Sequence, residues 1–286
     1  MSSLIQKVRD LSELVMFQHT IFSLPFIIIA MIVAANGWFG WTLLGWGILA
    51  ATTARSFAMG FNRYADRDID KDNPRTQSRP SVDGRLDEQS ILMFTTLNAA
   101  GFIFSAYMIN TTAFYLSFPV LLLLASYSLF KRFSWTAHLM LGVCLGFAPL
   151  AGTIAVSEST PLWSLYLSGG VLLWVAGFDL LYSLQDMAYD QQRGLYSIPS
   201  RFGITKTLMI ARFFHLGTTL LWCGFVVTSG LGLGGWLAVI LTAVMLGYEH
   251  HLVSRSLSNI NKAFFTVNGY LGLAFLMLVV CDYIIF

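Results

Sequence analysis

The sequence predicts an all-α membrane protein with nine transmembrane helices, arranged as two four-helix halves followed by a ninth helix. Three observations lead to this prediction. The 286 residues are 56% hydrophobic and only 11% charged, whereas a soluble domain carries roughly 25% charged residues. Several apolar runs reach the ~20 residues that a helix needs to cross a bilayer core. The charged residues gather in a few segments between these runs.

Apolar runs and the residues that interrupt them define the predicted helices. The first strong run, 17–35, has no small-residue cleavage site and is interpreted as a span. Short breaks such as Asn36-Gly37 and the glycine-rich stretch 230–235 carry residues that stop or cap helices. Longer breaks hold most of the charge. The predicted helices cover 14–36, 41–66, 88–109, 112–130, 135–156, 163–187, 205–229, 232–253 and 263–286.

The placement of the positive charges predicts an orientation. All 17 Lys and Arg residues lie in the N-terminal segment, in the longer loops, or on helices that lead to these loops. With nine spans, all these places fall on one side of the membrane, and the positive-inside rule makes that side the cytoplasm. We therefore expect an integral protein of the cytoplasmic (inner) membrane, with its N-terminus and charged loops inside and its C-terminus outside.

The layout of the chain also predicts an internal repeat within one transmembrane domain, 1–286. Asp66 and Asp186 lie 120 residues apart, and each ends the second helix of a group of four. The predicted halves cover about 14–130 and 135–253, and the ninth helix covers 263–286.

The first acidic cluster lies at the end of the second predicted helix. Asn62, Asp66 and Asp70 follow one another at four-residue spacing, which places them on one helical face. Arg55, seven residues before Asn62, continues this face into the apolar run, where a charge is costly and marks a cavity or pathway. Carboxylates alone repel a diphosphate, but Mg²⁺ joins one or two carboxylates to substrate phosphates.

A second acidic cluster ends the sixth predicted helix, where Asp179, Tyr182, Asp186 and Asp190 share one face. The two clusters together predict a diphosphate site with Mg²⁺ as the cofactor. The two clusters could converge on one diphosphate through two metal ions. Basic residues of the loops, together with Asn62, would bind the remaining diphosphate oxygens; they are Arg75, Arg79, Lys131, Arg132, Arg193 and Arg201.

These motifs resemble the UbiA superfamily of intramembrane aromatic prenyltransferases. The resemblance rests on Asn62-x₃-Asp66-x₃-Asp70, on the following Asn-Pro-Arg-Thr-x-x-Arg-Pro (73–80), and on Tyr182-x₃-Asp186-x₃-Asp190. It implies that Mg²⁺ held by Asp66, Asp70, Asp186 and Asp190 neutralises the diphosphate leaving group. It also implies that an aromatic acceptor attacks the allylic carbon. One position departs from the family pattern, because Arg63 stands where that motif usually has Asp.

The resemblance further implies the class of acceptor. Arg55 and Asn62 match positions that meet the acceptor's carboxylate, and Asp179 and Tyr182 are expected beside them. This implies an aromatic acid such as 4-hydroxybenzoate or a dihydroxynaphthoate, in ubiquinone or menaquinone biosynthesis. The segments 17–26 and 261–265 look most like the futalosine-pathway menaquinone branch.

The expected partners are therefore polyprenyl diphosphate, an aromatic acid and membrane lipid, with no nucleic acid and no obligatory protein partner. A haem- or chlorophyll-type prenyltransferase of the same family is an alternative. A secondary transporter that uses Arg55 and Asp179 as intramembrane sites is another. The gathering of charge at the cytoplasmic helix ends, away from the membrane midplane, favours the enzyme.

Overall fold

The computed structural model describes residues 4–15 and 22–285, and within this part every regular element is a helix. The all-α prediction is therefore confirmed. The chain forms two compact units. The first comprises Met1–Thr20 and Gly45–Leu129, and the second comprises Ile21–Leu44 and Phe130–Phe286.

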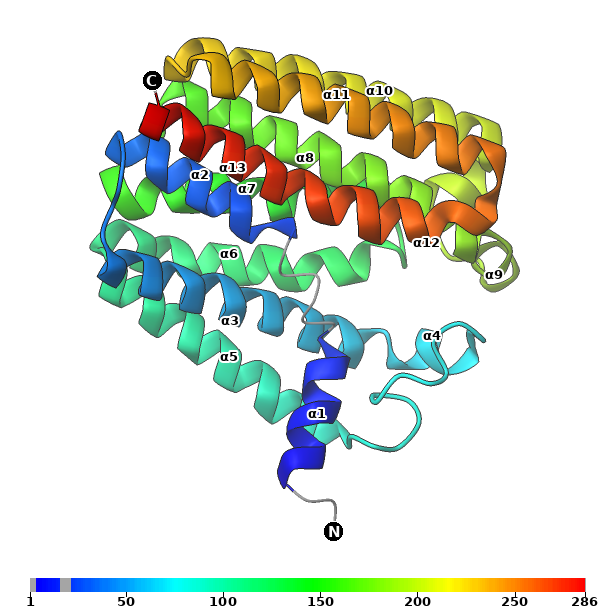
Figure 1. Cartoon of the computed structure of the whole chain (residues 1–286). Helices are drawn as coiled ribbons and strands as arrows, with labels where there is room; N and C mark the ends of the chain where they lie inside the picture. Colours follow the sequence, from blue (N-terminus) through cyan, green and yellow to red (C-terminus); the bar gives the residue numbers. More distant parts are fainter. Residues whose placement is uncertain (1–3, 16–21, 286) are drawn as a thin grey trace. The chain divides into compact units, whose positions relative to one another are not determined.

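In the first unit, α3 and α5 lie side by side (Figure 1). Gly60 permits this approach, since a Cβ added there would lie 2.5 Å from Thr95 Oγ1. A small apolar core of Leu14, Leu86 and Ile91 joins the N-terminal helix to the start of α5. The helices of this unit are α1 (Leu4–Leu14), α3 (Trp41–Ala65), α4 (Arg67–Asp72), α5 (Glu88–Ile109) and α6 (Thr111–Phe130).

In the second unit, α8 packs against both α7 and α10, while α2 contacts α7 and α13 (Figure 1). Phe26, Trp174, Trp222 and Phe225 are fully buried at its centre. The elements of this unit are α2 (Leu24–Ala35), α7 (Ala137–Ser157), α8 (Leu162–Ser183), the 3₁₀ turn η2 (Leu184–Asp186), α9 (Met187–Arg193), α10 (Ile198–Ser229), α11 (Leu233–Arg255), the 3₁₀ turn η3 (Leu257–Asn259), α12 (Ile260–Lys262), the π-helical turn η4 (Ala263–Val267) and α13 (Asn268–Ile285).

Several predicted helix boundaries are corrected by local backbone features. The helix predicted from residue 14 is described from Leu24 onward, and residues 16–21 lie outside the described part. A short helical segment from Ile198, where Ser197 and Ser200 form a capping box, precedes the helix predicted from 205, and Gly203, with φ 75° and ψ 175°, separates the two parts of α10. The helix predicted over 163–187 ends at Ser183.

Among the described residues, seven helical runs are long and apolar enough to cross a membrane. They are α5, α6, α7, the run from α8 through α9, α10, α11, and the run from η3 into α13. The chain is accordingly a multi-pass integral membrane protein. The predicted count of nine is not confirmed, since α2 has only 12 residues and α3 carries Arg55, Asn62 and Arg63.

Candidate active site

The first acidic cluster spans the junction of α3 and α4. The backbone N–H of Asp66 donates to Asn62 O at 2.9 Å, and that of Asp70 donates to Asp66 O at 2.8 Å. This helical hydrogen-bond pattern carries through the junction, so the three side chains stay on one face. Asn62 Nδ2 also donates to Asp66 Oδ2 at 2.8 Å. Asp66 and Asp70 are both buried.

Arg63 is a buried cation within this cluster. Its Nε donates to Leu14 O at 3.3 Å, and its Nη1 donates to Asn62 Oδ1 at 3.1 Å. The same Nη1 lies 3.9 Å from Asp70 Oδ2. The sequence marks Arg63 both as a departure from the related motif and as a salt-bridge partner for the acidic helix end, and the structure places it beside Asp70.

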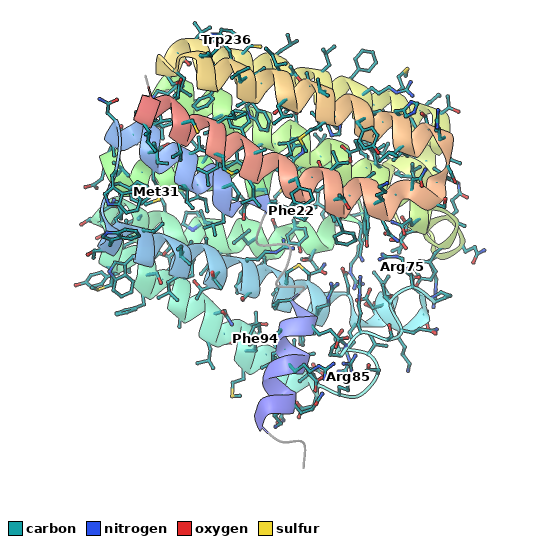
Figure 2. The ribbon with its side chains drawn as sticks, in the orientation of Figure 1. Phe22, Met31, Arg75, Arg85, Phe94 and Trp236 are labelled. Atoms are coloured by element: carbon teal, nitrogen blue, oxygen red, sulfur yellow. The ribbon has the colours of Figure 1, made fainter. Side chains whose placement is uncertain are left out.

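The loop after α4 folds back onto the cluster. Arg79 Nη1 donates to Asp70 Oδ2 at 2.6 Å, so a predicted diphosphate ligand is paired with a predicted metal ligand. Thr76 Oγ1 donates to Asp70 O at 2.8 Å, and Asn73 Oδ1 accepts from the N–H of Arg75 at 3.0 Å. The Arg75 side chain is exposed on this loop, as Figure 2 shows.

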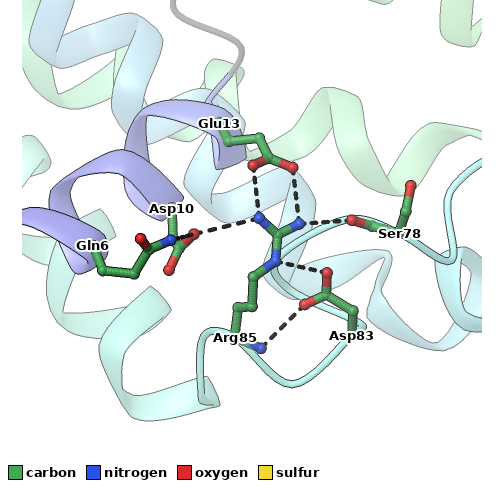
Figure 3. Close-up of polar contacts among 6 residues, drawn as sticks. All are labelled: Gln6, Asp10, Glu13, Ser78, Asp83 and Arg85. Atoms are coloured by element: carbon green, nitrogen blue, oxygen red, sulfur yellow. Dashed lines mark hydrogen bonds and ion pairs between the residues drawn. The ribbon is translucent and has the colours of Figure 1, made fainter. Parts of the chain in front are cut away.

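Arg85 anchors the end of this loop to α1 (Figure 3). Its guanidinium donates to both carboxylate oxygens of Glu13, at 2.7 and 2.8 Å, and to Ser78 O at 2.8 Å. Asp83 accepts at 2.7 Å and Asp10 at 3.3 Å. Hydrogen bonds from Arg85 lower the pKa of Glu13 and, in turn, raise the pKa of Arg85. Sequence spacing could not reveal this contact, because Glu13 and Arg85 are 72 residues apart.

Arg55 lies on α3, two turns before Asn62. It is half-buried, and its Nε has no hydrogen-bond partner among the described residues. An unsatisfied buried donor is costly unless a partner completes it. The position therefore fits an anionic ligand such as a carboxylate.

The second acidic cluster repeats the local geometry of the first. The helix breaks at Asp186, the last residue of η2, just as α3 breaks at Asp66. Each aspartate precedes the next helix as its N-cap, with φ −97°, ψ −2° at Asp186 and φ −99°, ψ 9° at Asp66. Asp190 follows on α9 and interacts electrostatically with Asp186 and Lys131.

Asp179 has a partner that the sequence did not reveal. His138, at the start of α7, approaches Asp179 Oδ2 with its Nδ1 at 2.7 Å, across 41 residues of sequence. His138 is buried, and its Nε2 has no partner among the described residues. Tyr182, one turn after Asp179, packs its ring on Phe264 with centroids 4.3 Å apart.

An open cavity of about 410 Å³ adjoins Asp190. Arg201 borders it on the first turn of α10. Tyr196, also on its border, donates its N–H to Lys131 O at 2.9 Å, which draws the segment between α6 and α7 to this rim. Arg132 and Arg193 are exposed; Arg132 follows Lys131 in the sequence, and Arg193 precedes Gly194 of the cavity lining. The lining residues are Asp190, Gln191, Gly194, Leu195, Tyr196, Ser197, Ser200 and Arg201.

The donor set suits a metal that is shared with a substrate. Among the described residues, no group of three or more His, Cys, Asp or Glu side chains could hold a metal by itself. Each unit instead offers two predicted carboxylate ligands on one helical face. Mg²⁺ commonly binds one or two carboxylates together with substrate phosphates.

Known proteins resemble this chain over most of its length. A sequence profile of the UbiA prenyltransferase family matches residues 23–278. A 4-hydroxybenzoate octaprenyltransferase from Janthinobacterium sp. (strain Marseille) is 30% identical over 267 residues, covering 90% of each protein.

Two solved structures extend the comparison. The apo structure of a UbiA homologue from Aeropyrum pernix K1 matches with a TM-score of 0.85 and 30% identity, covering 93% of this chain and 98% of that one. A UbiA homologue from Archaeoglobus fulgidus, bound to GPP and Mg²⁺, matches with a TM-score of 0.75, covering 96% and 100% of the two chains. Its 18% identity limits that likeness to the fold.

Proposed function

The chain belongs to the UbiA prenyltransferase family, as its motifs predict, and we propose that it transfers a polyprenyl group from polyprenyl diphosphate to an aromatic acid. The observation that carries this proposal is the pair of carboxylate clusters with matching backbone geometry at Asp66 and Asp186. Two such clusters suit a substrate that carries a diphosphate.

We propose Mg²⁺ as the cofactor, held by Asp66, Asp70, Asp186 and Asp190. When bound, the metal supplies charge neutralisation to the leaving diphosphate. Without substrate, Arg79 neutralises the buried Asp70 carboxylate. When substrate and metal bind, Arg79 would contact the diphosphate and the metal would neutralise Asp70, so that this carboxylate is compensated in both states. Asn62, Arg75, Lys131, Arg132, Arg193 and Arg201 bind the other diphosphate oxygens.

Arg55, Asn62, Asp179 and Tyr182 are the residues proposed to bind the acceptor. Arg55 pairs with the carboxylate of the aromatic acid, which satisfies its lone Nε. The name of the Janthinobacterium relative supports 4-hydroxybenzoate. The segments 17–26 and 261–265 favour a dihydroxynaphthoate of the menaquinone pathway instead; residues 16–21 lie outside the described part.

We further propose that α2 and α3 also cross the membrane, which gives nine spans as two four-helix halves and a ninth helix. The protein then lies in the cytoplasmic membrane with its active site at the cytoplasmic face. The segregation of Lys and Arg supports this orientation.

The proposal is tested with purified protein in detergent, Mg²⁺ and a polyprenyl diphosphate. The acceptor panel holds 4-hydroxybenzoate and the isomeric dihydroxynaphthoates. We expect prenylation of one of these acids, and loss of transfer in Asp66→Asn, in Asp186→Asn and in EDTA. Glu88→Gln, on the exposed start of α5, serves as a carboxylate control and should keep wild-type activity.

Each result bears on a different part of the proposal. Full activity in both aspartate variants, or in EDTA, would remove the metal assignment. Transfer to none of the aromatic acids, with active transfer to a haem or chlorophyll precursor, would replace the acceptor class.

A further inference from the structure

A π-helical turn precedes the last helix of the second unit. The turn η4 (Ala263–Val267) inserts between α12 and α13. One inserted residue rotates the following side chains by about 100° relative to an unbroken α-helix. Such turns are rare in proteins as a whole, and those that do occur are frequently found at functional sites. Something must therefore hold this backbone in place.

Asn268, the first residue of α13, holds the turn. Its Nδ2 donates to Ala263 O at 3.3 Å, across the turn, and to Glu249 Oε1 on α11 at 2.8 Å. Its Oδ1 accepts from Trp174 Nε1 on α8 at 2.7 Å. Asn268 is fully buried and Glu249 is 1% exposed. Water cannot reach these polar groups, so the hydrogen bonds between them are needed to satisfy them.

The turn presents Phe264 to α8. The Phe264 ring lies 4.3 Å from that of Tyr182, 5.1 Å from that of Phe178 and 5.5 Å from that of Phe22, measured between centroids. Tyr182 lies one helical turn before Asp186 in the second acidic cluster. A buried network in the second unit thus reaches the cluster through two aromatic rings.

We propose that the Glu249–Asn268 pair is a positioning device for the acceptor site. The pair fixes η4, η4 fixes Phe264, and Phe264 holds the Tyr182 ring in the orientation that binds the aromatic acid. Asn268, Glu249 and Phe264 are positioning residues, because they act through Tyr182. The proposal rests on the proposed function, in which Tyr182 contacts the acceptor.

The test compares Asn268→Leu, Glu249→Leu and Glu249→Gln. Leucine removes the hydrogen bonds at similar volume, whereas glutamine keeps the Oε1 acceptor. We expect Asn268→Leu and Glu249→Leu to raise the KM for the aromatic acid about tenfold. The KM for the prenyl diphosphate should change less than about twofold, and Glu249→Gln should stay close to wild type.

A second readout does not depend on activity. Hydrogen exchange of peptides covering 260–270 should accelerate in the two leucine variants and not in Glu249→Gln. Thr218→Val removes another buried hydrogen bond of this unit, to Gly170 O, and should alter neither the KM for the acid nor this exchange. If the leucine variants fail to fold, Phe264→Leu keeps the pair and should reproduce the acceptor-specific rise in KM.

Three results would overturn the inference. One is an unchanged KM for the aromatic acid in Asn268→Leu or Phe264→Leu. Another is an equal rise in both KM values. The third is hydrogen exchange over 260–270 that is the same in Asn268→Leu and wild type. Absence of transfer by the wild type would contradict the proposed function instead, and the exchange comparison would then still decide whether the pair holds the turn.

Discussion

The buried charge of Asp70 is balanced by arginines of the first unit. Asp70 is 4% exposed and faces two guanidinium groups, that of Arg79 at 2.6 Å and that of Arg63 at 3.9 Å. Removal of one partner from a buried ion pair costs about 3–5 kcal/mol, because the other charge remains buried. Arg79 and Arg63 thus compensate the buried carboxylate with cations of the chain itself.

The sequence predicted the shared face of Asn62, Asp66 and Asp70, but not the pairing of Arg79 with Asp70. Four-residue spacing is a local property of the helix, and the backbone hydrogen bonds at the α3–α4 junction preserve it. Pairings such as His138 with Asp179 join residues that are distant in sequence. They depend on tertiary packing, which spacing does not report.

Arg55 provides a prediction at the scale of one residue. Arg55→Ala should raise the KM for the aromatic acid by about tenfold or more, since a charge-assisted hydrogen bond to the acceptor carboxylate is lost. The KM for the prenyl diphosphate should change little. Steady-state kinetics with each substrate varied in turn measure both values.

Two controls sharpen this result. Arg55→Lys keeps the charge and should restore part of the affinity for the acid. An acceptor that lacks the carboxylate should bind wild type and Arg55→Ala equally. A larger effect on the diphosphate than on the acid would place Arg55 with the leaving group instead.

At the scale of the helices, breaks in the sequence predicted ends better than starts. The predicted break at Asn36-Gly37 is a left-handed cap in which Gly37 donates to Ile32 O at 3.0 Å. The early start of α10 was missed because Ser197 caps it in a polar segment. The turn η4 was missed because a π-helical insertion leaves the apolar run unbroken.

The contact between α1 and the loop before α5 depends on pH. The pKa of Glu13 lies below its ordinary value of 4.5, because Arg85 hydrogen-bonds to the carboxylate. A carboxylate whose pKa is lower in the folded than in the unfolded chain stabilises the fold at pH values above its pKa in the unfolded chain. This stabilisation is lost as the pH falls through the pKa of the folded state. Glu13 is 49% exposed, so the contribution is below about 1 kcal/mol after solvent screening.

Thermal unfolding of wild type and Glu13→Gln between pH 7 and 3 measures this contribution. The difference in Tm should be constant from pH 7 to about 5.5, and should shrink as the pH falls below the ordinary pKa of 4.5. In an Arg85→Ala background, Glu13→Gln should have almost no effect at any pH. A difference that survives in that background would assign it to contacts other than Arg85.

A cap supplied by another helix fixes the start of α11. Asp282 on α13 accepts from the N–H of Gly232 at 2.6 Å and from that of Gly234 at 2.9 Å. Asp282→Ala should lower stability by about 0.5–2 kcal/mol, as loss of an N-cap does. Thermal inactivation should show this loss, while Asp282→Asn, which keeps one acceptor oxygen, should lose less.

The prenyltransferase activity of the Asp282→Ala protein provides the matching check. The capped turn lies at the opposite end of α11 from Glu249. We therefore expect both KM values to remain at wild-type levels below the temperature of inactivation. A changed KM would mean that the cap also orders the acceptor side of the second unit.

At the scale of the whole molecule, the same structural device occurs twice. Each acidic cluster combines a helix break at an aspartate with a second aspartate one turn later. Each is followed by two arginines. Arg75 and Arg79 lie in the loop after α4, whereas Arg193 ends α9 and Arg201 lies in the first turn of α10. The internal repeat of two four-helix halves stays a prediction.

The number of membrane spans can be tested, because it determines on which side of the membrane the C-terminus lies. With the N-terminus inside and nine spans, the C-terminus lies outside. Alkaline phosphatase fused after Phe286 should therefore be active, and green fluorescent protein at the same place should be dark. Fusions after Ser258, which follow the eighth proposed span α11, should give the reverse pattern.

If either α2 or α3 does not cross the membrane, the two fusion sites exchange sides. If neither helix crosses, both fusion sites return to the sides that nine spans predict. Fusions after Asn36 and Asp83 separate that case, since nine spans place Asn36 outside and Asp83 inside.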